Sequence, residues 1–114
     1  MTTAADLAQR QLDAYNAHDI EAFVACFAED VVVADVRTGA VIMQGREAMH
    51  ARYGALFARP ALHAALVSRT TLGDDVVLDV ERVAGLRDDG GEVDAVAIYE
   101  RRGDVIARVW FVRP

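Results

Sequence analysis

Hydrophobic residues along the chain follow two different spacings. In residues 4–27 and 46–59 they recur every three or four positions, which is typical of helices that bury one face. In residues 31–44 and from residue 62 onward they alternate or form short β-branched runs, which is typical of strands. The pattern therefore predicts helices and a short hairpin first and a larger sheet afterwards.

Two helices are expected near the N-terminus. The first spans residues 4–17, because Thr3 and Asp6 have the spacing of a capping box that satisfies the first free backbone N–H groups. Asp19 caps the second helix, whose apolar stripe extends to Phe27. The two form a helical hairpin.

A short β-hairpin and a third helix follow. Residues 31–36 are a β-branched run, and the turn at residues 38–39 leads to a partner strand at residues 41–44. The third helix begins after Gly45 and ends before Pro60, whose ring and missing N–H stop a helix.

Four longer strands complete the chain. They are separated by turns rich in glycine and aspartate, so we expect an antiparallel meander. The predicted fold class is α+β, with the order α-α-β-β-α-β-β-β-β in one domain over residues 1–114. Three N-terminal helices pack on one face of a curved, mainly antiparallel sheet. The four strands are residues 62–72, 76–86, 93–101 and 105–112.

Composition and charge remove several classes of function. Twelve basic and 18 acidic side chains give a net charge of −6, which disfavours nucleic acid and an anionic membrane as partners. The single cysteine, Cys26, excludes an internal disulfide and a thiolate metal cage. No apolar run reaches the ~20 residues that span a bilayer. We expect a soluble, cytoplasmic protein.

Metal and cofactor signals are also missing. The three histidines, His18, His50 and His63, show none of the spacings typical of a metal site. Gly90-Gly91 lies in a hairpin turn rather than between a strand and a helix, so it is not a phosphate-binding loop. The sequence predicts no metal ion and no cofactor.

Four segments carry a family resemblance: residues 15–19 (YNAHD), 27–31 (FAEDV), 44–49 (QGREAM) and 106–111 (IARVWF). They resemble the nuclear transport factor 2-like superfamily, in its branch of SnoaL-like cyclases and ketosteroid isomerases. The resemblance implies a cone-shaped fold with a deep apolar pocket between the helices and the concave face of the sheet. It also implies a small apolar ligand and a homodimer formed through the sheet.

Asp35 is the candidate general base. The resemblance implies this role, because Phe27 to Asp35 matches the Phe-Ala-x-Asp-x-x-x-x-Asp pattern that ends in the catalytic aspartate of ketosteroid isomerases. A carboxylate among apolar neighbours accepts protons more readily near neutral pH, because its ionised form is disfavoured. The alternative is that Asp35 begins the hairpin turn at residues 36–39 or pairs with Arg37.

The same resemblance indicates where a substrate oxygen would be polarised. Ketosteroid isomerases use a tyrosine on the first helix and a protonated aspartic acid on a later strand. Gln11 and Ala97 occupy these positions here. Gln11, or Tyr15 one turn further along, can donate a hydrogen bond, whereas the side chain of Ala97 cannot. Isomerisation of 3-oxosteroids is therefore not expected, and proton abstraction from a smaller carbonyl compound remains open.

An acidic pair on the second long strand gives a further hypothesis. Epoxide hydrolases of this superfamily hold a water with an Asp-Arg-Asp set, and the nearest set here is Asp79, Glu81 and Arg82. Alternation separates the two acids from the apolar residues beside them. We therefore expect the acids on the outer surface, paired with an arginine of a neighbouring strand such as Arg69 or Arg101.

Aromatic side chains are spread over all three helices and the last two strands. Tyrosine and tryptophan usually keep a polar atom near water or a ligand. Besides Tyr15, we expect ligand contacts from Tyr53, Phe57, Tyr99 and Trp110, with ordinary core packing as the alternative.

Two functions remain open. The first is an isomerase, cyclase or hydrolase for a small hydrophobic carbonyl or cyclic compound, with Asp35 as base and Gln11 or Tyr15 polarising the oxygen. The second is a ligand-binding or dimeric accessory domain without enzymatic activity. A cavity lined by Tyr15, Asp35, Tyr53 and Trp110 would favour the enzyme, and a pocket plugged by aromatic rings would favour the binding protein.

Overall fold

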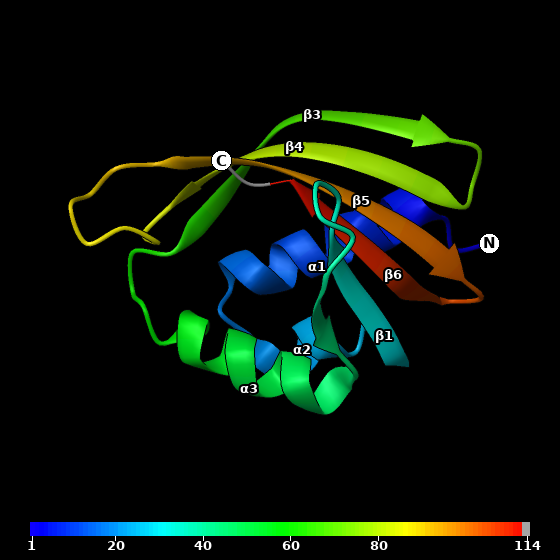
Figure 1. Cartoon of the computed structure of the whole chain (residues 1–114), viewed down its shortest axis with the longest axis horizontal. Coiled ribbons are helices and arrows are strands. Elements are labelled where there is room, and N and C mark those ends of the chain that lie inside the picture. Colours follow the sequence, from blue (N-terminus) through cyan, green and yellow to red (C-terminus); the bar gives the residue numbers. More distant parts are fainter. Residues whose placement is uncertain (113–114) are drawn as a thin grey trace.

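Three helices cover the concave face of one curved sheet (Figure 1). The helices are α1 (Ala4–Asn16), α2 (Ile20–Val24) and α3 (Arg46–Phe57), and the strands are β1 (Phe27–Asp35), β2 (Val41–Gln44), β3 (His63–Leu72), β4 (Val76–Ala84), β5 (Val93–Arg102) and β6 (Val105–Val112). This computed structural model describes residues 1–112, in which the strands follow the order β2-β1-β6-β5-β4-β3. Within that order β1 and β6 are parallel and the other neighbours are antiparallel.

The predicted α+β class is confirmed, and the elements follow one another broadly as expected. The capping box of α1 is present: Thr3 Oγ1 accepts from the backbone N–H of Asp6 (3.1 Å), and Asp6 Oδ2 accepts from that of Thr3 (2.9 Å). Asp19 caps α2 by accepting from the N–H of Ala22 (3.1 Å). No helix within residues 1–112 has the length and apolar character needed to cross a membrane.

The second helix is shorter than predicted. It ends at Val24, because Phe27 already pairs with Ile106 of β6 as the first residue of β1. The N–H of Ile106 also donates to the carbonyl oxygen of Cys26 (2.8 Å), so the chain joins the sheet here instead of continuing as a helix. Phe27 is fully buried as part of the core, which satisfies its hydrophobic character without a helix.

β4 ends two residues before its predicted end at Leu86. Gly85 has a φ of 83°, and a Cβ atom placed on it would lie 2.4 Å from the backbone of Ala61. Only glycine fits such a close backbone approach in this conformation. The chain therefore leaves the sheet at Gly85, and Leu86 turns toward the helices, where it lines the cavity described below.

The face of β4 that meets the helices carries its two acids. Val77 and Asp79 are completely buried, whereas Leu78 and Val80 on the other face are half-buried. The expectation that Asp79 and Glu81 lie on the outer surface was therefore wrong. The strand is apolar on both faces, so alternation separates the acids from Leu78 and Val80 but cannot say which set faces inward.

Candidate functional site

A cavity of about 440 Å³ lies between the helices and the concave face of the sheet. Side chains of α1, α3 and the strands line it, and most are apolar, among them Leu12, Val33, Leu56 and Phe111. A cavity of this size and character is large enough for a small organic molecule. Its few polar side chains therefore decide what it can bind or transform.

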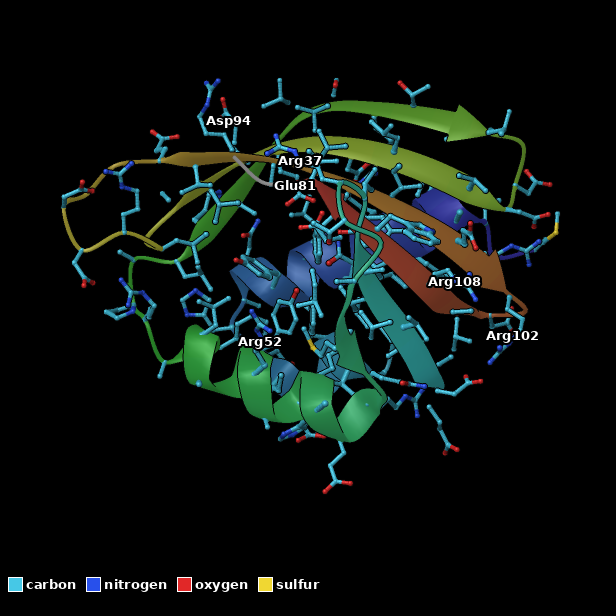
Figure 2. The ribbon with its side chains drawn as sticks, in the orientation of Figure 1. Arg37, Arg52, Glu81, Asp94, Arg102 and Arg108 are labelled. Atoms are coloured by element: carbon cyan, nitrogen blue, oxygen red, sulfur yellow. The ribbon has the colours of Figure 1, made fainter. Side chains whose placement is uncertain are left out.

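Glu81 supplies the acid of the cavity from β4 (Figure 2). Its Oε1 is the one buried side-chain oxygen or nitrogen in residues 1–112 that has no hydrogen-bond partner. The pKa of Glu81 is raised to about 7, chiefly by burial and then by the nearby Asp79 carboxylate. Arg69 and a hydrogen bond from Tyr99 act in the opposite direction. This carboxyl group therefore changes its charge near neutral pH inside the cavity.

Asp79 is paired and closed off from the cavity. Its Oδ1 and Oδ2 accept from Nε (2.7 Å) and Nη2 (2.9 Å) of Arg69 on β3, and the side chain of Asp79 is 0% exposed. Nη1 of Arg69 donates to Oε1 of Gln9 on α1 (2.9 Å). The predicted pairing with Arg69 is thus confirmed. Neither Asp79 nor Arg69 lines the cavity, so Glu81 alone of these three residues faces it.

Three tyrosines surround the same space. Tyr15, Tyr53 and Tyr99 all line the cavity, from α1, α3 and β5 respectively. Burial raises the pKa of Tyr15 and of Tyr99 well above the usual range, so both hydroxyls stay protonated at neutral pH. Tyr99 stands opposite Val77 in the register of β4 and β5, so its ring must extend along the sheet to bring the hydroxyl to Glu81. The site therefore combines one acid with neutral hydroxyl donors.

Gln11 and Ala97 also line the cavity. Gln11 is buried, and its Nε2 donates to the carbonyl oxygen of Ala8 (2.9 Å), which holds the amide against its own helix. Ala97 offers only a methyl group, but Tyr99 lies two residues further along the same face of β5. On this face of β5, Tyr99 rather than Ala97 therefore brings a hydroxyl group to the cavity lining.

Asp35 lies at the end of β1, away from these residues. Its Oδ1 accepts from the backbone N–H groups of Arg37 (2.7 Å) and Thr38 (3.2 Å), and the N–H of Gly39 donates to its carbonyl oxygen (2.8 Å). These bonds are those of an aspartate that organises a hairpin turn. Asp35 is not among the residues lining the cavity.

Phe57 and Trp110 take positions different from those of the three tyrosines. Phe57 is buried in an aromatic cluster and packs edge-on against Tyr15 at 5.3 Å between ring centroids, without lining the cavity. Trp110 pairs with Ile98 on the outer face of the sheet, where the guanidinium of Arg108 lies 5.7 Å from its ring. Phe57 therefore packs behind Tyr15, and Trp110 lies on the opposite side of the sheet from the cavity.

Two of the three histidines, His18 and His50, have side-chain partners within the protein. Nε2 of His18 lies 2.7 Å from the carbonyl oxygen of Leu62, and Nε2 of His50 lies 2.7 Å from Oε1 of Glu21. Within residues 1–112, no three histidine, cysteine, aspartate or glutamate side chains come close enough together to hold a metal ion.

The position of Glu81 in the cavity was missed because its face of β4 was assigned wrongly. The sequence could not have corrected this: Val77 and Val83 share the parity of Glu81, but Leu78 and Val80 make the other face equally apolar. The contact between Tyr99 and Glu81 has no signal in the sequence either, because it depends on how the ring lies along the sheet.

The arrangement of three helices on a curved sheet is the nuclear transport factor 2-like fold, and solved structures share it. An uncharacterised protein from Novosphingobium aromaticivorans, described as having a cystatin fold, is 32% identical over 99% of this chain and 100% of its own, with a TM-score of 0.86. A putative polyketide cyclase from Sinorhizobium meliloti is 27% identical over 94% of each chain, with a TM-score of 0.78.

A third structure shows the fold alone. It is a protein from Catenulispora acidiphila with a ketosteroid isomerase-like fold, solved in complex with trimethylamine, at 20% identity over 96% of this chain and 86% of its own, with a TM-score of 0.77. The curated proteins give no match. The model of the SnoaL-like domain matches residues 8–109, so the chain belongs to the SnoaL-like family.

Proposed function

We propose that this protein binds a small apolar carbonyl compound and transfers a proton on it, with Glu81 as the base. The observation that carries the proposal is the partnerless Oε1 of a buried carboxyl group that lines the cavity. An unsatisfied buried polar atom costs about 1–3 kcal/mol, so a domain that only needed to fold would gain from satisfying it. A substrate hydrogen would give this oxygen its partner.

The chemistry follows from the groups that surround the cavity. The carboxylate of Glu81 takes a proton from the carbon beside the carbonyl, and the electrons of the C–H bond move to the carbonyl oxygen to form an enolate. The neutral hydroxyl of Tyr15 donates a hydrogen bond to that oxygen and stabilises its charge, while the hydroxyl of Tyr99 is bonded to Glu81. Glu81 then returns the proton to the same carbon or to a conjugated one. A base whose pKa is about 7 has a suitable affinity for both steps near neutral pH.

Two other mechanisms have less support. Hydrolysis by the set Asp79, Glu81 and Arg82 would need all three side chains around one water. Asp79 is instead bonded to Arg69 outside the cavity, and Arg82 pairs with Asp94 in an exposed position. A base at Asp35 would need its carboxylate to leave the turn that it stabilises. The family membership and the neighbour named as a putative polyketide cyclase agree with carbanion chemistry on a carbonyl compound.

Proton transfer is tested by the exchange of α-hydrogens of 2-tetralone for deuterium in D2O, followed by NMR. We expect the protein to accelerate the exchange above buffer, with a rate that rises through about pH 7 as Glu81 ionises and is constant above it. Glu81→Gln should lower the protein-dependent rate about 100-fold or more. Asp35→Asn should leave it within about twofold. Loss of activity in Asp35→Asn with retention in Glu81→Gln would instead assign the base to Asp35.

We also propose that the outer sheet face pairs with a second copy of the chain. Leu78 and Ile98 are directly opposite each other in the register, Trp110 is opposite Ile98, and all three are only half-buried. Charges of both signs flank them, including the pair of Arg82 with Asp94, which suits a self-complementary contact. Light scattering at micromolar concentration should give twice the 12.4 kDa chain mass, and Ile98→Asp should halve it. A monomer mass for the unmodified protein would contradict the dimer.

A further inference from the structure

One face of α3 forms part of the helical side of the cavity. Arg52, Ala55, Leu56 and Arg59 all line it, and their spacing of three, four and seven residues puts them on the same side of the helix. The cavity therefore has a wall with two arginines facing a sheet that carries Glu81.

The two arginines have different surroundings. Nε of Arg59 donates to the carbonyl oxygen of Gly85 (2.6 Å), and Nη2 of Arg59 pairs with Asp88 (2.8 Å), so the protein already holds this guanidinium in place and neutralises its charge. The guanidinium of Arg52 is exposed and has no hydrogen bond or ion pair with any residue in the described range 1–112. Among the described residues, the side chains of Arg10 and Arg37 also lack such a partner, but neither lines this cavity. Arg52 is therefore the arginine that can offer its donors to a ligand here.

We propose that Arg52 binds a carboxylate of the substrate, so that the ligand is an apolar carbonyl compound with an acid group at one end. A guanidinium donates two parallel hydrogen bonds to a carboxylate, which fixes the ligand's direction as well as its affinity. Figure 2 shows Arg52 on the α3 side and Glu81 on the sheet side of the space between the two layers. A ligand held by Arg52 therefore extends across the apolar walls toward Glu81.

This inference rests on the proposed function for its reacting carbon, but the acid-binding step can be measured alone. The probes are 2-naphthoate and its uncharged analogue 2-naphthamide, which share one ring system, and their affinities are measured by calorimetry. At pH 6 Glu81 is mainly protonated, so it does not repel the anion. We expect the protein to bind 2-naphthoate about tenfold more tightly than 2-naphthamide.

Arg52→Gln should remove this preference by weakening 2-naphthoate about tenfold, while leaving the affinity for 2-naphthamide unchanged. Arg37→Gln is the matched control, because it removes the same charge from an exposed turn that does not line the cavity, and it should keep the preference. Equal affinities in the unmodified protein, no binding of either probe, or a preference that survives Arg52→Gln would overturn the inference.

The two proposals fail separately. Glu81→Gln should keep the preference for 2-naphthoate even though it loses proton exchange on 2-tetralone, which carries no acid group. If Glu81→Gln retains exchange and Arg52→Gln loses the preference for 2-naphthoate, Glu81 is not the base but Arg52 still binds the anion. If Glu81→Gln loses exchange and Arg52→Gln keeps the preference, Glu81 is the base but Arg52 does not bind the anion.

Discussion

Glu81→Gln should stabilise the protein by on the order of 3 kcal/mol at pH 9 and by less than about 1 kcal/mol at pH 5. Burial and the neighbouring Asp79 raise the pKa of Glu81 from its ordinary 4.5 to about 7 in the folded protein. Below 4.5 the carboxyl is protonated in both the folded and the unfolded states, and its contribution to stability is fully present. As the pH rises toward 7 the unfolded chain releases its proton first, so that contribution is lost.

The measurement is urea unfolding of the two proteins at several pH values between 5 and 9. The free energy of unfolding of the unmodified protein should fall across this range relative to that of Glu81→Gln, and the difference should become constant above about pH 8. Glu92→Gln provides the control, because Glu92 is exposed and the same chemical change there should shift stability by less than about 0.5 kcal/mol at either pH. A pH-independent difference would mean that Glu81 is not buried as an acid in the folded state.

Local sequence signals predicted where the helices begin better than they predicted where α2 and β4 end. Thr3, Asp6 and Asp19 act on backbone groups within three residues, so their capping roles follow from sequence spacing alone. The end of α2 and the end of β4 depend instead on distant segments. Phe27 is taken into the sheet by Ile106, and Gly85 marks where Ala61 crosses the chain. Contacts of this kind leave no periodic trace in the sequence.

The candidate site likewise combines features that the sequence predicts with features that only the tertiary structure decides. The aspartate at position 35 fits a family spacing and an ordinary turn equally well, and only the fold separates the two by showing where the cavity lies. The pairing of Asp79 with Arg69 could be expected, because the two residues carry opposite charges on adjacent strands. That Asp79 is enclosed while Glu81 faces the cavity depends on α1, which reaches the pair through Gln9. Helix placement over a sheet is a tertiary property.

Arg69→Met should destabilise the protein by about 3–5 kcal/mol at neutral pH, because it leaves the Asp79 carboxylate buried without its cation. Asp79 is 0% exposed and accepts both of its hydrogen bonds from Arg69, so water cannot replace the lost partner without disrupting the contact of α1 with the sheet. Gln9→Ala is the control: it removes one exposed hydrogen bond to Arg69 and should cost about 1 kcal/mol or less. A cost for Arg69→Met as small as that of the control would contradict this.

Adding Asp79→Leu to Arg69→Met should recover most of the lost stability, since a leucine at this position packs against the buried Val77 and Ala97 and needs no hydrogen-bond partner. The double variant also separates the effect of the ion pair on folding from its effect on the pKa of Glu81. Asp79 raises the pKa of Glu81 and Arg69 lowers it, so removing both should move the midpoint of the pH–rate profile less than removing Arg69 alone, which should raise it. Unchanged midpoints in both variants would show that burial alone sets the proton affinity of Glu81 and that the ion pair serves only to hold the strands and α1 together.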